Sequence, residues 1–413
     1  MSESTRLSRH RIADLTVFAI ELALLAAAIV VGALLNHRGV KLHADAAPLY
    51  AGWGPHVGIG TPIALLLAIG VVWRGPRWAA TAPWPRLLAV GYATALAWTL
   101  SLALVDGWSA GLTQKLTVQA EYLYEVPRVT SVREMLAGFA DRILAFQPDS
   151  WSTHTAGHPP GALLLFVWLD RIGLGGGTAA GLACVVLGAT VSVSIPVALR
   201  ALGAEDAARA VWPFLLLFPG AVWVGASGDG IFAGVVAAGL ALLVAGGRSS
   251  AALGGLLLGF ALYLSYGFIL VGLLALAVLA LRARDRLGAL VVSGLAAAVV
   301  VAVFTWAGFN WLDGYHLVVR RYYQGWAADR PYAYWVWANL AAFLLSAGPV
   351  VGPAVRRAVV AGLDGWRDRW RPAVWLPLVA VVVVLSADLS GLSKAEVERI
   401  WLPFAGWLLV ATA

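Results

Sequence analysis

Residues 15–35 read LTVFAIELALLAAAIVVGALL, and Glu21 is the only charged side chain among them. A helix that rises about 1.5 Å per residue needs roughly 20 such apolar residues to cross the hydrocarbon of a bilayer. Residues 87–105 meet the same requirement. Residues 296–303 are apolar in succession, whereas a strand of a membrane β-barrel alternates apolar and polar residues. These runs predict an all-α, polytopic transmembrane protein.

The composition of the whole chain excludes a soluble globular domain. Hydrophobic residues make up 61% of the 413 residues and charged residues only 12%, so folding in water would leave too much apolar surface exposed. We expect residues 1–413 to form a single integral membrane domain with about ten to twelve spans, and the segment 251–281 decides the count. The candidate spans are residues 13–35, 58–73, 87–105, 177–199, 210–226, 230–246, 251–264, 267–281, 287–308, 336–354, 373–388 and 400–413.

The basic residues indicate how the chain is oriented. They bring the formal charge to +7, but they lie in short segments between spans and not in one patch that would bind nucleic acid. Because short cytoplasmic loops are enriched in basic residues, the segments 6–11, 74–86, 200–209, 282–286 and 356–371 predict a cytoplasmic N-terminus. Arginine greatly outnumbers lysine, which is typical of a GC-rich bacterial genome and indicates the bacterial inner (plasma) membrane.

In this orientation residues 106–176 form an extracytoplasmic loop with juxtamembrane helices. The part from Asp106 to His158 mixes Trp, Tyr, Glu, Asp and His, and it is too long to be a mere connector. We expect it to fold against the membrane surface as a candidate catalytic loop. The alternative is a surface cap with no catalytic role.

The loop ends in the sequence His158-Pro159-Pro160-Gly161, followed by an apolar run. Proline in the first helical turn fixes the entry angle and costs no intrahelical hydrogen bond. Residues 160–172 are too short to cross a bilayer core, so we expect a juxtamembrane helix at the outer interface. The next full crossing is then residues 177–199.

These residues resemble the GT-C superfamily of polytopic membrane glycosyltransferases, which includes protein O-mannosyltransferases and aminoarabinose transferases. In those enzymes a large outer loop carries an essential acid and ends in a His-Pro-Pro or Lys-Pro-Pro turn. The resemblance runs from about residue 121 to Asp229, with Leu199–Gly203, Phe218-Pro219 and Ser227-Gly228-Asp229 resembling later turns, and residues 396–403 resemble a late outer loop of actinobacterial relatives. It implies that His154 and Asp229 bind substrate. The chain departs from the family in having three expected spans before the loop and no Asp-Asp or Asp-Glu pair in it.

The resemblance implies transfer of a sugar from a polyprenyl-phosphate donor to an extracytoplasmic cell-envelope acceptor, which would be a lipid, a glycan or a protein. Such transfer needs a base for the acceptor hydroxyl. Glu121 and Glu125 are one helical turn apart, so a helix would direct both carboxylates to one cleft. Glu121 is the preferred base. Glu125, Asp141, Asp149 and the earlier Asp45 are the alternatives.

Two histidines accompany these acids. His154 and His158 are four residues apart, but Gly157 and the prolines argue against a helix there, and no third zinc ligand is evident. We therefore predict no metal site at this pair, and His158 either hydrogen-bonds to substrate or loop carboxylate or stabilises the turn. A cofactor cannot be assigned from these residues, and a divalent cation remains an open alternative.

A lipid-phosphate donor also requires cations at the outer face. One cluster contains His316 with Arg320 and Arg321, and another runs from Ser393 to Trp401 with Glu396 and Arg399. Guanidinium donates two parallel hydrogen bonds to phosphate oxygens. The alternative role for both clusters is anchoring at headgroup depth, where arginine and aromatic residues are common.

A transporter or lipid flippase is the competing function. That class predicts broken helices and polar groups near the bilayer midplane, yet the central parts of the expected spans are almost devoid of charge. Glu21 is an intramembrane acid about one turn from the cytoplasmic end of its span, and we expect a structural role in which its side chain either extends to the interface or pairs with a neighbouring helix. A structural assembly partner is a third possibility.

Overall fold

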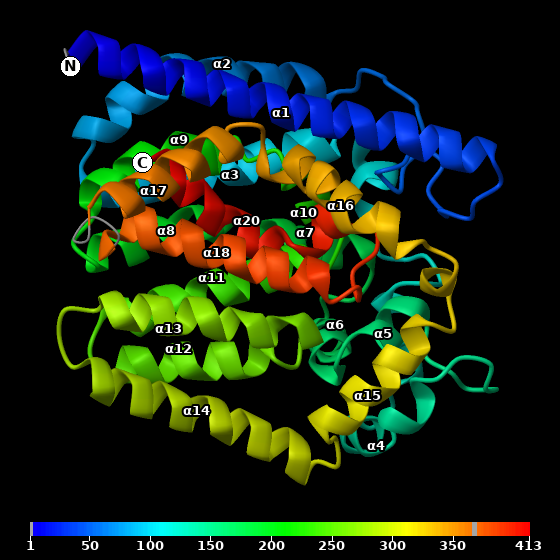
Figure 1. The fold of residues 1–413 in the computed structure, drawn as a ribbon. Helices are drawn as coiled ribbons and strands as arrows, with labels where there is room; N and C mark the ends of the chain where they lie inside the picture. Colours follow the sequence, from blue (N-terminus) through cyan, green and yellow to red (C-terminus); the bar gives the residue numbers. More distant parts are fainter. Residues whose placement is uncertain (1–2, 366–369) are drawn as a thin grey trace.

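The computed structural model describes residues 3–365 and 370–413, with side chains from His10 onward. The regular secondary structure of the described chain is helical apart from an isolated β-bridge between Ala46 and Leu49, and both ends lie on the left of Figure 1. Residues 366–369, part of the basic segment 356–371, lie outside the described residues, as do the side chains of Arg6 and Arg9. The α-helices are α1 Glu3–His37, α2 Gly60–Thr81, α3 Trp84–Ala103, α4 Val132–Ala137, α5 Thr153–Gly157, α6 Pro160–Arg171, α7 Gly177–Ala189, α8 Val191–Ala201, α9 Glu205–Leu216, α10 Ala221–Val224, α11 Asp229–Ala245, α12 Arg248–Ala261, α13 Val271–Leu281, α14 Arg286–Trp306, α15 Trp311–Tyr322, α16 Tyr332–Ala347, α17 Val351–Asp364, α18 Pro372–Leu389, α19 Val397–Ile400 and α20 Leu402–Leu409.

Six helical segments in the described chain are long and apolar enough to cross a membrane. Many of the long helices run across the view in the same direction, which is the arrangement of a helical membrane bundle (Figure 1). The prediction of an all-α, multi-pass membrane protein is therefore confirmed. The six segments are His10–His37, Gly60–Thr81, Trp84–Ala103, Gly177–Ala201, Arg286–Trp306 and Pro372–Leu389.

This number is smaller than the ten to twelve spans expected from hydropathy. Several other apolar runs form helices that are too short for a full crossing, among them Asp229–Ala245, Tyr266–Leu281 and Leu402–Thr412. Most residues of α11 and α20 are buried inside the protein. A helix surrounded by other helices can be apolar without touching lipid, so hydropathy alone does not determine the number of spans. The basic residues Arg74 and Arg77 also continue α2 instead of forming a loop.

The expected span 336–354 is bent. α16 and α17 meet at an angle of 100°, and Gly348, with φ of +92°, lies at the break where a side chain would be strained. Glu21 of α1 accepts a hydrogen bond of 2.8 Å from the backbone N–H of Gly352. A carboxylate at this position satisfies an amide that the first turn of α17 leaves free. Glu21 therefore contacts a neighbouring helix, which is one of the two alternatives that the sequence left open.

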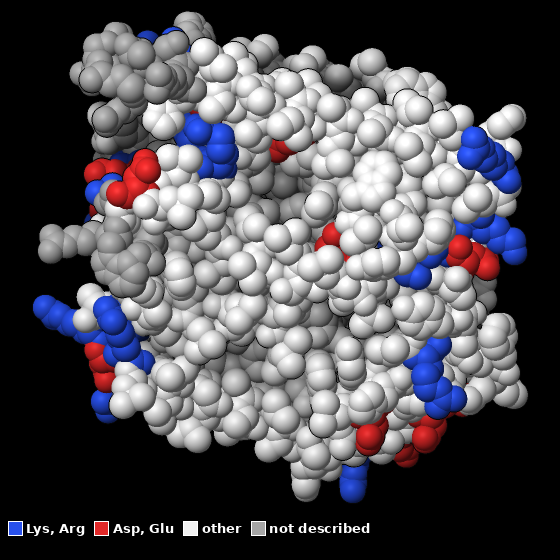
Figure 2. Space-filling model, viewed as in Figure 1, with Lys and Arg blue, Asp and Glu red and all other residues white. Residues whose placement is uncertain are grey.

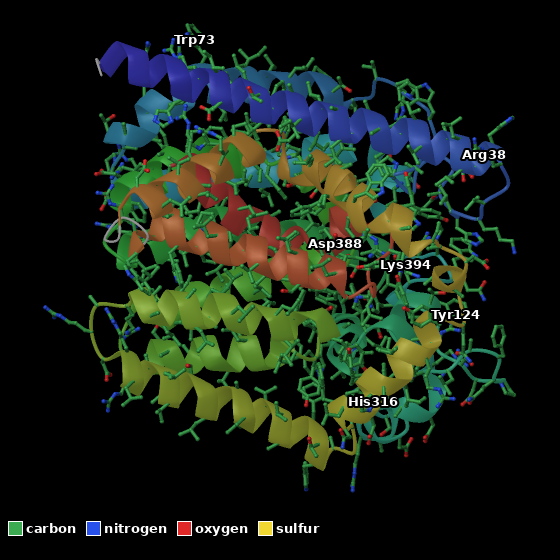
Figure 3. The ribbon with its side chains drawn as sticks, in the orientation of Figure 1. Arg38, Trp73, Tyr124, His316, Asp388 and Lys394 are labelled. Carbon is green, nitrogen blue, oxygen red and sulfur yellow. The ribbon has the colours of Figure 1, made fainter. Side chains whose placement is uncertain are left out.

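Charged side chains gather at the two ends of the molecule, and the broad surface between them is nearly uncharged (Figure 2). At the end that carries the N-terminus, Arg356 pairs with Asp14 at 2.6 Å. Arg38 and Lys394 lie toward the opposite end, with Tyr124 (Figure 3). An uncharged band between two charged ends matches the polarity profile of a bilayer.

Residues 106–176 fold into short helices and turns, with α4, α5 and α6 gathered beside α15 on the right of Figure 1. α6 occupies nearly the range predicted for a helix after Pro160, but Leu163, Leu164 and Phe166 on it are almost fully buried. A Cβ atom at Gly161 would lie 2.5 Å from the carbonyl oxygen of Tyr263, so glycine permits this close packing. The loop is thus part of the protein core at this end.

Candidate functional site

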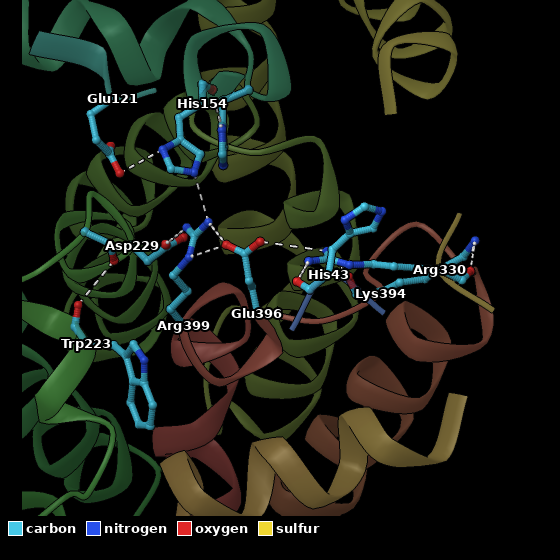
Figure 4. A network of polar contacts seen from close by, with 11 residues as sticks. His43, Glu121, His154, Trp223, Asp229, Arg330, Lys394, Glu396 and Arg399 are labelled. Atoms are coloured by element: carbon cyan, nitrogen blue, oxygen red, sulfur yellow. Dashed lines mark hydrogen bonds and ion pairs between the residues drawn. The ribbon is translucent and has the colours of Figure 1, made fainter. Parts of the chain in front are cut away.

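Five of the residues singled out in the sequence meet in one polar network (Figure 4). They come from four segments of the chain: the loop before the turn Tyr122–Tyr124, α5, the first residue of α11, and α19 with the residue before it. The network therefore depends on the tertiary fold and not on any local motif. Its members are Glu121, His154, Asp229, Glu396 and Arg399.

Arg399 occupies the centre of this network. Its NH1 donates to Asp229 Oδ2 at 2.9 Å, and its Nε and NH2 donate to Glu396 Oε2 at 3.2 and 2.6 Å. Burial by itself lowers the pKa of Arg399, but Glu396 and Asp229 raise it above the usual range. Arg399 is therefore a permanent cation held between two carboxylates.

His154 connects Arg399 to Glu121. Its Nε2 is 3.1 Å from Arg399 NH2, and its Nδ1 is 2.7 Å from Glu121 Oε1. A guanidinium can only donate hydrogen bonds, so Nε2 must be the acceptor. The imidazole in this contact is then neutral, with its proton on Nδ1. Nδ1 lies close to the Glu121 carboxylate, but the two groups are not aligned as a hydrogen bond.

The segment that carries Glu396 has an unusual backbone. Ala395 and Glu396 have φ values of 70° and 61°, a left-handed conformation that is unfavourable for residues other than glycine. Asn339 supports it, because its Oδ1 accepts from the Ala395 N–H at 3.1 Å and its Nδ2 donates to the Ser393 carbonyl at 2.7 Å. Such a supported strained turn is common at functional sites.

Glu396 remains ionised in this setting. Burial raises the pKa of its carboxyl, but the charge of Arg399 and the hydrogen bonds from it lower the pKa below its ordinary value overall. Arg330 adds a second cation, with NH1 3.9 Å from Glu396 Oε1. Glu396 thus links two guanidinium groups.

Arg330 is a buried cation whose importance the sequence did not reveal, and it contacts Lys394, a buried cation of the Ser393–Trp401 cluster. Arg330 donates to the carbonyls of Leu42 at 3.1 Å, His43 at 3.1 Å and Lys394 at 2.8 Å. Lys394 Nζ donates in turn to the carbonyls of Ala327 and Arg330 at 2.9 and 3.1 Å. These bonds hold the loop between α18 and α19 in place. An isolated arginine before a proline carries no sequence pattern that would have identified it.

Glu125 does not share a cleft with Glu121, so the expectation of two carboxylates on one helical face is wrong. Residues Tyr122–Tyr124 and Val126–Arg128 form 3₁₀ turns, whose pitch differs from that of an α-helix. Glu125 is fully buried and accepts hydrogen bonds from Arg128 NH1 at 3.0 Å and the Ser152 N–H at 2.7 Å. It therefore anchors the segment that leads into α5.

His158 lies beside the network but does not join it. Its Nδ1 is 2.8 Å from the carbonyl oxygen of His154, and its ring packs against Tyr122 and Phe232. Burial lowers the pKa of His158. α5 is a short helix that includes Gly157, contrary to the expectation that no helix forms there. His158 closes this helix and supports the backbone that carries His154.

The remaining candidates are more exposed. Asp45, Asp141 and Asp149 all lie on the surface. Arg320 and Arg321 belong to the last turn of α15, and neither makes an ion pair within the described residues. Burial lowers the pKa of Arg321. The neighbouring Tyr322 hydroxyl accepts from the Lys394 N–H at 2.8 Å, so this end of α15 touches the loop that leads to Glu396.

Within the described part of the chain, no group of three or more His, Cys, Asp or Glu side chains is arranged to hold a metal ion. In the network itself the Arg399 guanidinium lies between the carboxylates of Asp229 and Glu396. A cation is therefore already supplied by the protein at this position. The chemistry available here is proton transfer by a carboxylate–imidazole pair next to a fixed positive charge.

No protein-family model matches the chain, and no curated protein and no solved structure matches it either. The likeness to GT-C glycosyltransferases therefore rests on the quoted sequence motifs. Function has to be inferred from the network and from its position in the helical bundle.

Proposed function

We propose that the protein is a membrane glycosyltransferase of GT-C type that transfers a sugar from a polyprenyl-phosphate donor to an extracytoplasmic cell-envelope acceptor. The observation that carries the proposal is the chain of contacts from Glu121 through His154 to Arg399. It combines a proton acceptor with a cation in one buried cluster at an end of an apolar bundle.

Each part of the cluster matches a requirement of glycosyl transfer. The acceptor hydroxyl must lose a proton as its oxygen attacks the anomeric carbon, and the Glu121–His154 pair supplies a base. The leaving phosphate gains negative charge, and Arg399 supplies a fixed positive charge. Arg320 and Arg321 on the adjacent α15 are further cations for the donor phosphate.

A membrane-embedded donor suits the position of the cluster. The prenyl chain of such a donor lies in the bilayer, so its phosphate is at headgroup depth, where the network meets the apolar helices. The distribution of basic residues supports a cytoplasmic N-terminus in the bacterial inner membrane. The network lies near Lys394, toward the end opposite the N-terminus (Figures 3 and 4), and would then be extracytoplasmic.

A transporter or lipid flippase is the second candidate, and the bend of 100° between α16 and α17 favours it. Secondary transporters use broken helices near the bilayer midplane to bind substrates. Here, however, the free backbone N–H of Gly352 donates to Glu21, so a side chain of the protein already occupies this amide next to the break. This observation makes the transferase the better supported function.

The deciding experiment uses the full chain purified into lipid nanodiscs. Radiolabelled polyprenyl-phosphate sugars are offered with lipid, glycan and peptide acceptors, and labelled acceptor is quantified. We expect label to appear in one acceptor class, and we expect a Glu121 variant to lose this labelling. Movement of labelled donor across proteoliposomes without any labelled acceptor would instead establish the flippase function.

A further inference from the structure

We propose that His154 is the base that takes the acceptor's proton, that Glu121 orients it, and that Arg399 covers it until the donor phosphate is bound. This inference rests on the proposed glycosyl transfer. It changes the role of Glu121 from the base to a positioning residue.

The protonation state of His154 carries the first step. Because Arg399 NH2 can only donate, the lone pair of Nε2 faces Arg399 and the proton is on Nδ1. The Glu121 carboxylate, 2.7 Å from Nδ1, favours this tautomer. It also stabilises the imidazolium that forms when Nε2 takes a second proton.

Access to solvent separates the two residues further. The His154 side chain is 22% exposed and that of Glu121 only 9%. Glu121 Oε1 lies on the Nδ1 side of the imidazole, whereas Nε2, the basic nitrogen, points toward Arg399 inside the network (Figure 4). An acceptor hydroxyl therefore reaches His154 more directly than Glu121.

Arg399 occupies the lone pair of His154 Nε2. Its NH2 donates to Glu396 Oε2 at 2.6 Å and to His154 Nε2 at 3.1 Å. A hydrogen bond to a carboxylate is shorter and stronger than one to a neutral ring, so the contact with His154 is the one that a phosphate oxygen displaces. Glu396 and Asp229 keep the guanidinium in place during this exchange. Donor binding thus uncovers the base, and the donor must bind before the acceptor reacts.

Sugar transfer breaks two bonds and forms two. The acceptor O–H bond breaks and its proton binds Nε2, while the acceptor oxygen forms a bond to the anomeric carbon. The bond between that carbon and the phosphate oxygen breaks, and its electron pair leaves with polyprenyl phosphate. The products are the glycosylated acceptor, polyprenyl phosphate and a His154 imidazolium that releases its proton to solvent.

Chemical rescue tests the assignment in nanodisc-embedded full-length protein. His154→Ala should lose about 10²–10⁴ in the rate of transfer. Added imidazoles should restore part of it, with rates that rise with the basicity of the imidazole used. Glu121→Ala should gain nothing from formate or acetate. The assignment would be overturned if imidazoles of similar size but different basicity restored His154→Ala to the same rate. Rescue of Glu121→Ala by formate would also overturn it.

His154→Gln provides a second variant, because glutamine keeps hydrogen-bonding capacity without a basic nitrogen. It should fail to transfer sugar while binding the donor at least as tightly as wild type. His56→Gln, an exposed histidine outside the network, is the matched control and should transfer normally. Near-normal transfer by His154→Gln overturns the inference alone. Absence of transfer by wild-type protein with every donor and acceptor overturns the proposed function as well.

Discussion

Arg399 donates to Asp229 at 2.9 Å across a separation of 170 residues. The pair joins α19, near the end of the chain, to the first residue of α11. Asp229 is 4% exposed, so each charge depends on the other for compensation. Disrupting the pair should therefore affect folding as well as any chemistry at the network.

We expect Arg399→Gln to lower the free energy of unfolding by about 3–5 kcal/mol, because it leaves the buried Asp229 carboxylate without its cation. Asp229→Asn should cost less, because Arg399 keeps its ion pair with Glu396. The double variant should lose less than the sum of the two, with a coupling of roughly 0.5–3 kcal/mol. Thermal unfolding in detergent of matched composition measures these values. Additive losses would show that the two side chains do not interact.

Donor binding gives a second prediction. Arg320 is exposed, so Arg320→Ala should change the free energy of unfolding by no more than about 0.5 kcal/mol. Loss of a charged hydrogen bond to phosphate should raise the apparent KM for the donor about ten- to a hundredfold. Steady-state transfer assays with varied donor measure this change. An unaltered KM in Arg320→Ala and Arg321→Ala would assign both residues to membrane anchoring.

Topology gives a third prediction. In a Cys184→Ala background, which removes the single buried cysteine, Thr130→Cys should react with a membrane-impermeant thiol reagent added outside intact cells. Gly365→Cys should react only after permeabilisation, because the arginine distribution puts it in the cytoplasm. The reverse labelling pattern would put the network on the cytoplasmic side and remove the extracytoplasmic acceptor from consideration.

Glu398 gives a prediction about pH. Its carboxyl is 3% exposed, and burial raises its pKa from 4.5 to about 7. Since the folded state holds this proton more tightly than the unfolded state, the contribution to stability is complete below about pH 4.5 and is lost as pH rises through about 7. Wild-type Tm should therefore fall between pH 5 and pH 8, and Glu398→Gln should reduce that fall. An identical pH profile in the variant would contradict a raised pKa.

The sequence predicted the fold class well because hydropathy reports burial in an apolar medium. Residues 13–35 and 373–388, for example, fall within helices of the expected kind. Residues 230–246 form the apolar helix α11 as expected, but it has only 17 residues and most of them are buried inside the protein, so their apolar character does not by itself indicate contact with lipid. The bend at Gly348 was missed, because one glycine has no effect on a hydropathy average.

The site was predictable residue by residue but not as an arrangement. Glu121, His154 and Arg399 were each identified from their chemistry and from family resemblance. Their mutual contacts depend on the 3₁₀ turns after Glu121 and on the left-handed backbone at Glu396, neither of which has a periodic signature. For the same reason the sequence paired Glu121 with Glu125, whereas the fold pairs it with His154.

Single-turnover transfer from a radiolabelled polyprenyl-phosphate sugar tests the central claim most directly. Wild type, Glu121→Gln and the exposed-acid control Glu134→Gln are compared at equal folded concentration, with donor binding measured in parallel. Glu121→Gln should lose about 10²–10⁴ in rate with donor binding nearly intact, because glutamine cannot hold His154 in its basic tautomer. Glu134→Gln should transfer like wild type. Transfer by Glu121→Gln at the wild-type rate would contradict a catalytic role for the network.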